Sequence, residues 1–320
     1  MRIVALVPGG IGDQVLFFPT LTALNAAYPQ ADSDVIVEPR SMGAYRVCKL
    51  VSSVMPFDFR ARSSPADWAN LLGILRDRYY DIVLYSGQQW GIDVLLWLTG
   101  IPQRVSYANS LGQGFLTHAI SPNPDQYAAA MYHDLLKGLG LTTACPPLSI
   151  NVPRGDVEWA EAERSRLHLD EGGYVLIHSG ACPLSQSEEL GSGYPVASWQ
   201  AIVQDFQQRQ PDLPVVVAKS PADTTLVPEL TSVAPGLKVV EPSDLGKLAA
   251  MIAGASLMIC PNGVPMQLAV AIQVYTLALF GPTDPATQLP QDEKFVGIKS
   301  PTDQLSDITP EMVLKRVWGE

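Results

Sequence analysis

Short apolar runs alternate with helix-length segments along most of this chain. In its first part the apolar runs cover residues 2–8, 34–39, 55–59, 81–87 and 104–108, and the helical patterns cover 13–28, 66–80 and 92–98. Runs that are apolar at successive positions are typical of strands buried on both faces, and helix-length connections between them favour parallel pairing. The pattern predicts a parallel sheet covered by helices.

The same alternation restarts after a polar, proline-bearing stretch at 140–156. Apolar runs then cover 173–180, 214–220, 237–241, 256–261 and 274–282, and helical patterns cover 196–208, 224–233, 245–253 and 265–272. We predict an α/β protein of two Rossmann-like, doubly wound parallel-sheet domains that face a central cleft. The domains cover 1–150 and 157–305, and residues 306–320 form a C-terminal helix, for which packing back on the N-terminal domain is one arrangement.

Composition limits the classes of partner. The 320 residues suffice for two domains with cores of their own, and the net charge of −11 disfavours binding to nucleic acid or anionic lipid. The sequence lacks a signal peptide and an apolar run of about 20 residues, which predicts a cytoplasmic protein without a transmembrane segment and leaves peripheral membrane contact open. Four scattered cysteines and four histidines show no metal-ligand spacing, so no metal is predicted. The oligomeric state is left undefined.

A glycine turn, "PGGIGDQVL", follows the first apolar run. A dinucleotide fingerprint requires a third glycine, but Val15 stands at that position after Gly10 and Gly12. A dinucleotide site also has an acidic residue at the end of the second strand, where it binds the ribose. Glu38 stands at that position, and nothing else supports this role for it. These departures disfavour a nicotinamide or flavin oxidoreductase, because the third glycine permits close packing of helix on strand.

Asp13 stands where the helix after this turn begins, and two roles are open. It can cap the helix through free backbone N–H groups, or it can present a general base to a ligand. The positive end of the helix is expected to lower the pKa of Asp13 and to weaken it as a base. The local pattern does not choose between the two roles.

Several motifs appear in order along nearly the whole chain. They are "GGIGDQVLFFPTLTALNAAYP", "LIHSGA", "YPVASW", "DLGKLAAMIAGASLMIC" and "CPNGVPMQLAVAIQVYTLALFGPTDP". Together they resemble the ADP-heptose:lipopolysaccharide heptosyltransferase family (glycosyltransferase family nine). The resemblance implies the two-domain GT-B fold and inverting sugar transfer without a metal. It also implies that a nucleotide-diphosphate sugar is the substrate, that no cofactor is needed, and that the acceptor is a glycan or lipopolysaccharide.

The resemblance also implies roles for individual residues. Asp13 would deprotonate the acceptor hydroxyl, and Gly10, Ile11 and Gly12 would bring backbone amides to the acceptor or the diphosphate. The donor nucleotide would lie on His178, Ser179, Gly180, Asn262, Gly263, Val264, Pro265, Met266, Gln267, Gly281, Pro282, Thr283 and Asp284. His178 also fits a hydrogen-bonded histidine near the core. Gln88 and Gln89, in a loop after an apolar run, are candidates to line the acceptor pocket.

The donor-side motifs depart from the family pattern. Asn262 and Gln267 replace an aspartate and a histidine, and Ser192 and Gly193 stand where a lysine or arginine is expected. Tyr194 replaces a tryptophan, and Lys219 is a candidate to supply the missing charge. Two hypotheses follow: a glycosyltransferase with Asp13 as base, which we favour, and a non-catalytic binding or scaffolding protein with a degenerate donor site. The replacements and the overall acidity support the second hypothesis, because an enzyme acting on an anionic acceptor gains from basic loops.

Overall fold

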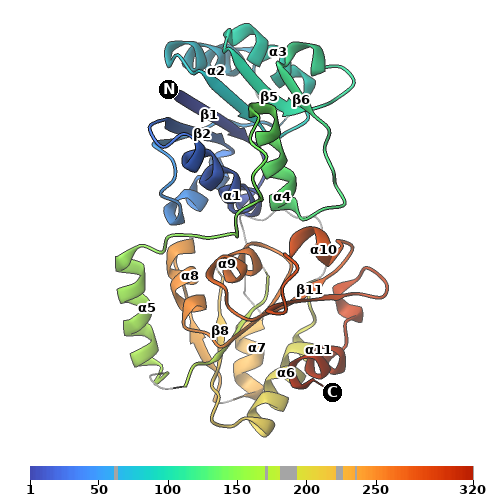
Figure 1. Cartoon of the computed structure of the whole chain (residues 1–320). Coiled ribbons are helices and arrows are strands. Elements are labelled where there is room, and N and C mark those ends of the chain that lie inside the picture. Colours follow the sequence, from blue (N-terminus) through green and yellow to red (C-terminus); the bar gives the residue numbers. More distant parts are fainter. Residues whose placement is uncertain (61–63, 170–171, 181–192, 221–225, 235, 320) are drawn as a thin grey trace. The chain divides into compact units, whose positions relative to one another are not determined.

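The computed structural model describes residues 1–60, 64–169, 172–180, 193–220, 226–234 and 236–319 (Figure 1). The chain divides into two compact units, Met1–Leu148 and Ser149–Glu320. Each unit contains one parallel sheet of six strands with helices packed on it. The predicted α/β class and the two doubly wound sheets are therefore confirmed. Ser192 lies outside the described residues, as does most of the segment "LSQSEELGSG" at 184–193.

In the first unit the strand order is β3-β2-β1-β4-β5-β6. The strands are β1 Arg2–Val7, β2 Asp32–Val37, β3 Ser53–Pro56, β4 Ile82–Tyr85, β5 Gln103–Tyr107 and β6 His118–Ile120. The helices are α1 Ile11–Ala27, α2 Pro65–Asp77, α3 Trp90–Thr99 and α4 Ala128–His133, with 3₁₀ helices η1 Pro39–Val47, η2 Gln113–Phe115 and η3 Asp134–Leu139. All strands are parallel, so their carboxyl ends lie along one edge of the sheet.

In the second unit the strand order is β12-β11-β10-β7-β8-β9. The strands are β7 Val175–His178, β8 Val215–Ala218, β9 Lys238–Val240, β10 Leu257–Pro261, β11 Thr276–Phe280 and β12 Phe295–Lys299. The helices are α5 Arg154–Arg166, α6 Val196–Arg209, α7 Leu226–Val233, α8 Leu245–Ala253, α9 Val264–Ile272, α10 Pro285–Gln288 and α11 Pro310–Trp318, with a 3₁₀ helix η5 Leu305–Asp307. None of the described helices combines the length and the apolar character needed to cross a bilayer.

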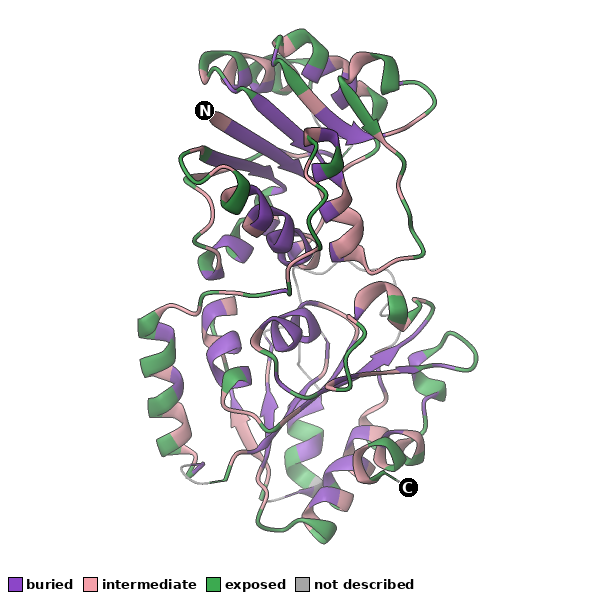
Figure 2. Cartoon of the chain, in the orientation of Figure 1, coloured by how far each residue is buried: buried purple, intermediate pink, exposed green. Residues whose placement is uncertain are grey.

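The central strands are buried along their whole length because helices cover both faces of each sheet. Ile3 to Val7 of β1 and all of β7 and β11 are buried (Figure 2). This explains why these strands read as continuous apolar runs and not as alternating patterns. Two short strands, β6 and β12, were not predicted, because their sequences are too polar or too short to stand out.

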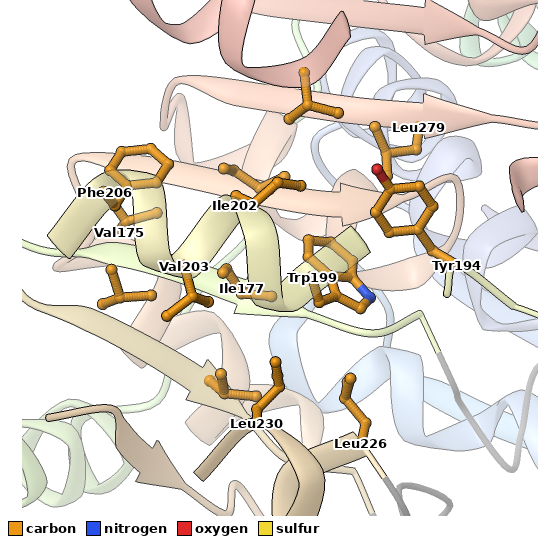
Figure 3. Close-up of a cluster of buried hydrophobic side chains, with 14 of the residues drawn as sticks. Val175, Ile177, Tyr194, Trp199, Ile202, Val203, Phe206, Leu226, Leu230 and Leu279 are labelled. Carbon is orange, nitrogen blue, oxygen red and sulfur yellow. The ribbon is translucent and has the colours of Figure 1, made fainter. Parts of the chain in front are cut away.

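Trp199 lies at the centre of the core of the second unit (Figure 3). It is completely buried, and the ring of Tyr194 packs edge-on against it with centroids 4.9 Å apart and an interplanar angle of 81°. Tyr194 stands where the family pattern has a tryptophan, and it points into this core beside Leu279. The replacement therefore keeps an aromatic ring packed in this core.

The C-terminal helix belongs to the second unit. In α11, Val313 is fully buried in the core that contains Trp199, and Trp318 Nε1 donates a hydrogen bond of 2.8 Å to Asp205 on α6. The Trp318 ring also packs against Phe206 with centroids 5.1 Å apart. The apolar face of this helix therefore packs within its own unit, and its suggested packing on the N-terminal domain stays a prediction.

Candidate functional site

The glycine turn connects β1 to α1 at the carboxyl edge of the first sheet. Gly9 has a φ of +109°, and Ser41 on η1 donates a hydrogen bond of 2.8 Å to its carbonyl oxygen. A Cβ atom on Gly9 would lie 2.3 Å from Oδ2 of Asp13. Only glycine permits this backbone conformation together with this close approach, so Gly9 allows the Asp13 carboxylate to fold back over the turn.

The Asp13 carboxylate is held by two donors. The Gly10 backbone N–H donates to Oδ2 at 2.7 Å, and the Tyr132 hydroxyl on α4 donates to Oδ1 at 3.0 Å. Burial raises the pKa of Asp13 above its ordinary value, although both hydrogen bonds and the nearby charge of Arg40 act to lower it. The expectation that the helix terminus would lower this pKa is wrong, because desolvation exceeds the effect of the backbone donors.

Asp13 can cap helix α1 and act as a general base at the same time. Oδ2 of Asp13 closes the first turn of α1, while the side chain remains partly exposed. A carboxylate whose pKa is raised accepts a proton more readily than an ordinary aspartate, and its two hydrogen bonds fix its orientation. The Nε of Arg40 is buried without a described hydrogen-bond partner, so this guanidinium keeps donor capacity close to Asp13.

The other predicted acceptor residues differ in accessibility. Ile11 is buried in the core, whereas a Cβ atom at Gly12 would meet nothing within 4 Å. Gln88 is exposed, but Gln89 uses its side chain to donate a 3.1 Å hydrogen bond to the Phe59 carbonyl. Gln89 therefore connects the loops after β4 and β3, and Gln88 is the better placed of the two to reach a ligand.

Glu38 has a structural role in the loops after β2 and β3. It is buried, and its Oε1 accepts a 3.2 Å hydrogen bond from the Phe59 backbone N–H. Burial, assisted by the charge of Asp58, raises the pKa of Glu38. Because the Glu38 carboxylate is bonded to the protein backbone, it is not placed as a ribose ligand, which agrees with the incomplete dinucleotide fingerprint.

In the second unit the predicted donor residues follow the adjacent strands β7, β10 and β11. His178, the last residue of β7, is buried, and its Nδ1 accepts a 2.9 Å hydrogen bond from the Gly180 N–H. Gly180 has a φ of +83°, and a Cβ atom there would lie 2.9 Å from Cγ of Pro261. His178 and Ser179 thus form the base of a tight turn packed against the end of β10.

The loop after β10 leads directly into α9. Asn262 donates its backbone N–H to the Leu279 carbonyl at 2.8 Å, and Gly263, with a φ of +155°, is the N-cap residue of α9. No described side chain caps this helix, so its first turn offers backbone N–H groups and a positive dipole end. Val264, Pro265 and Met266 form that turn and are buried.

The side-chain amide of Gln267 donates to the Gln288 carbonyl at 3.2 Å, and its Oε1 is buried without a described partner.

The loop after β11 contains Gly281, Pro282, Thr283 and Asp284. Asp284 caps α10 through a 2.9 Å hydrogen bond from the Ala286 N–H, and Oγ1 of Thr283 is buried without a described partner. The Lys299 ammonium, at the end of the adjacent strand β12, donates to the Gly281 carbonyl and pairs with Asp303. Lys299 therefore brings a positive charge to this loop.

The other candidate cation, Lys219, lies elsewhere along this edge. Its ammonium pairs with Glu241 at 2.7 Å, and it directly follows Ala218 of β8, which pairs with His178 at the end of β7. Its suggested role at the donor site stays a prediction. No group of three His, Cys, Asp or Glu side chains within the described ranges is arranged to hold a metal ion.

A family model described as glycosyltransferase family 9 (heptosyltransferase) matches residues 68–316. The chain belongs to glycosyltransferase family 9. Among curated relatives, it is 25% identical over 331 aligned residues to an Arabidopsis thaliana protein named photosynthetic NDH subunit of subcomplex B 1, chloroplastic, covering 96% of this chain and 71% of that protein. It is 21% identical over 288 residues to lipopolysaccharide heptosyltransferase 3 of Escherichia coli, covering 85% of this chain and 81% of that protein.

Solved structures of family 9 proteins share the fold. A family 9 glycosyltransferase from Veillonella parvula superposes with a TM-score of 0.80 at 19% identity, covering 99% of this chain and 96% of the other. The E. coli ADP-heptose lipopolysaccharide heptosyltransferase II superposes with a TM-score of 0.77 at 18% identity, covering 100% and 98%. These likenesses confirm the predicted GT-B fold.

Sequence reasoning did not single out three residues that the structure places at these loops. Gly9 was not singled out among the glycines of the turn, although its φ identifies it as the one that the carboxylate requires. Tyr132 on α4 was not singled out, because its contact with Asp13 spans 119 residues of sequence. Lys299 lies on the unpredicted strand β12.

Removing the Tyr132 hydroxyl should alter the titration of Asp13. We expect Tyr132→Phe to raise the pKa of Asp13 further, because the hydroxyl donates to the ionised carboxylate and stabilises that form. The acid limb of the pH profile of kcat/KM should therefore move to higher pH. Tyr107→Phe is the control, because its hydroxyl donates to the Met131 carbonyl and not to Asp13. An acid limb that is identical in Tyr132→Phe and wild type would remove Tyr132 from the site.

Proposed function

We propose that the protein is a cytoplasmic glycosyltransferase that moves a sugar from a nucleotide-diphosphate donor to a hydroxyl of a glycan or lipopolysaccharide-type acceptor. Asp13 accepts the proton of that hydroxyl as the hydroxyl attacks the anomeric carbon, and the nucleoside diphosphate departs with inversion. The observation that carries this proposal is the Asp13 carboxylate, which is positioned by Gly10 and Tyr132 and has a raised pKa. The reaction uses no metal and no cofactor beyond the donor.

The diphosphate fits the carboxyl edge of the second sheet. Gly263 leaves the first turn of α9 uncapped, and an uncapped helix N-terminus binds phosphate oxygens through backbone N–H groups. Thr283 lies in the loop after β11, and its buried Oγ1 has no described partner. Lys299, beside Gly281, supplies the positive charge for the leaving group that the family pattern places at Ser192 or Gly193.

Lys299 provides a direct test of this donor site. We expect Lys299→Met to weaken nucleoside diphosphate binding about tenfold, because one charge-assisted contact to phosphate is lost. Lys219→Met is a matched control, since both lysines follow a strand and pair with one acidic side chain. Calorimetric titration of both variants measures the difference. Equal affinities for the two variants would exclude Lys299 from the donor site.

A second candidate is a non-catalytic subunit of a larger assembly. The Arabidopsis relative, which matches 96% of this chain, is named as a subunit of an NDH subcomplex. The side chain of Gln267, which replaces the family histidine, is engaged with Gln288. Both observations are compatible with a fold retained for binding after its donor site has lapsed.

Acceptor-dependent release of nucleoside diphosphate distinguishes the two candidates. ADP-heptose and UDP-glucose are offered as donors, with and without lipopolysaccharide core oligosaccharide. The transferase proposal expects diphosphate release that increases with acceptor and a product whose new bond is inverted. The subunit candidate expects no release above buffer from either donor and no saturable nucleotide binding.

A further inference from the structure

Helix α3 has an unusual exposed face. Its inner side chains Ile92, Leu95 and Leu96 are buried in the core of the first unit. Its outer side is also apolar: Trp90, Trp97 and Leu98 are 56%, 52% and 42% exposed. A helix that is apolar on all sides is normally covered on all sides, so this outer face lacks a cover within its own unit.

The exposed apolar surface extends from α3 onto the loop after β5. The α3 surface, as we define it, consists of Trp90, Val94, Trp97, Leu98, Leu111 and Phe115. Of the nine large hydrophobic residues that are exposed in the described ranges, four belong to it. The positions on α3 are spaced by four, seven and eight residues from Trp90, which places them on one side of the helix.

The loop that carries Leu111 is fixed to α3. Asn109 donates a 2.6 Å hydrogen bond to the buried carboxylate of Asp93 and accepts one of 3.2 Å from the Leu111 N–H. The Phe115 ring contacts the Trp97 ring with centroids 5.8 Å apart. Leu111, 68% exposed, is therefore held beside α3 with its side chain in solvent.

Charge is nearly absent from this surface. Between Ile82 and Pro124 the sequence contains two charged residues, Asp93 and Arg104, and Asp93 is buried. Arg104 donates to the Phe115 carbonyl at 3.0 Å, and Arg76 on α2 donates to the Leu98 carbonyl at 2.7 Å. Neither arginine takes part in a described ion pair. The α3 surface is thus rich in tryptophan and leucine, with two arginines at its margin that donate to its backbone carbonyls.

The acidity of the chain is concentrated elsewhere. Residues 1–148 contain ten Lys and Arg against eleven Asp and Glu, a net charge of −1, whereas residues 149–320 contain eleven against twenty-one, a net charge of −10. The net charge of −11 therefore does not keep the first unit away from an anionic surface. The two units therefore differ in charge, and the apolar surface lies on the nearly neutral first unit. This distribution is compatible with membrane contact through the first unit.

We propose that the α3 surface docks the protein on a lipid bilayer with anionic head groups. Trp97, Leu98 and Leu111 enter the interfacial region, where tryptophan is favoured, and Arg76 and Arg104 face the lipid phosphates. The α3 surface begins at Trp90, directly after the loop that follows β4. In that loop the Ser86 backbone N–H donates to the Leu6 carbonyl of β1 at 3.1 Å. Because β1 and β4 are parallel neighbours, this end of the surface lies at the same sheet edge as Asp13. Docking would thus bring a lipid-anchored acceptor to the base, and this last step rests on the proposed function.

Sedimentation with vesicles tests the docking. Vesicles of phosphatidylcholine with about 30% phosphatidylglycerol should bind the wild-type chain, and the double variant Trp97→Asp, Leu111→Asp should partition at least about tenfold less. Tyr275→Asp in the second unit, at a residue 57% exposed, is the matched control and should bind like wild type. Arg76→Gln should bind about fivefold less to these vesicles and should be unchanged on phosphatidylcholine alone.

Three outcomes would overturn the proposal: no sedimentation of the wild type, equal binding by the double variant, or equal loss in Tyr275→Asp. A wild-type dimer in lipid-free ultracentrifugation that the double variant dissociates would assign the surface to a second copy of the chain and would also overturn it. Thermal melting of each variant verifies folding. The vesicle experiment contains no nucleotide sugar, so its failure is distinguishable from failure of the transferase proposal.

Discussion

Replacing Asp13 with asparagine should lower kcat by about 10²- to 10⁴-fold, the usual contribution of a positioned general base. The neutral amide cannot accept the proton of the acceptor hydroxyl. Asparagine has nearly the same shape as aspartate and can keep both hydrogen bonds. Its Oδ1 can accept from the Gly10 N–H, and its Nδ2 can donate to the Tyr132 hydroxyl oxygen. Steady-state kinetics of nucleoside diphosphate release measure the loss.

Stability and binding should separate from activity in Asp13→Asn. Burial raises the pKa of Asp13, so the stability of the folded state falls as the pH rises from the unfolded pKa to the folded pKa, and it stays reduced above the folded pKa. Above that pH, asparagine should therefore melt at the same temperature or higher, and nucleotide affinity should not change. Retained turnover in this variant would remove Asp13 from the mechanism, whatever the melting temperature.

Replacing Gly9 with alanine should damage both the fold and the activity. The backbone at Gly9 has a φ of +109°, and the new Cβ would lie 2.3 Å from Oδ2 and 2.7 Å from Cγ of Asp13. The backbone conformation alone costs about 1–3 kcal/mol in a residue with a side chain, and the carboxylate must move away from Gly10. We expect a lower free energy of unfolding in denaturant titration and a loss of kcat/KM approaching that of Asp13→Asn.

Gly12→Ala is the matched control in the same turn. Gly12 lies within α1, and a Cβ atom there meets nothing within 4 Å, so alanine should preserve stability or raise it by up to about 1 kcal/mol. If the acceptor approaches the Gly12 backbone, as the family resemblance implies, the methyl group should raise KM for the acceptor and leave nucleotide affinity unchanged. Equal stability of Gly9→Ala and Gly12→Ala would contradict this account of the turn.

The order of apolar runs was sufficient to predict the two sheets, because strands buried on both faces leave a strong sequence signal. The turn residues and Asp13 were found for the same reason, since they follow β1 directly. The sign of the pKa shift at Asp13 was not predictable. It depends on desolvation and on Tyr132, which is 119 residues away in sequence.

The donor side was harder to predict from sequence. The motifs identified the loops after β7, β10 and β11, but the charge near Gly281 comes from Lys299 on β12, a strand whose sequence "FVGIK" is short and interrupted by glycine. Sequence also does not give the strand order, which puts Lys219, after β8, beside the end of β7 and not beside the loop after β11. Long-range order of this kind is set by tertiary packing, which local patterns do not record.

Calorimetric titration with ADP, UDP and GDP tests the central claim most directly, because sugar transfer from a nucleotide donor requires a working diphosphate site. The account predicts saturable binding of one of these nucleotides to the wild-type chain with a Kd in the micromolar to millimolar range, retained in Asp13→Asn and weakened about tenfold in Lys299→Met. Absence of binding by all three nucleotides at millimolar concentration would contradict the transferase account and favour the non-catalytic subunit.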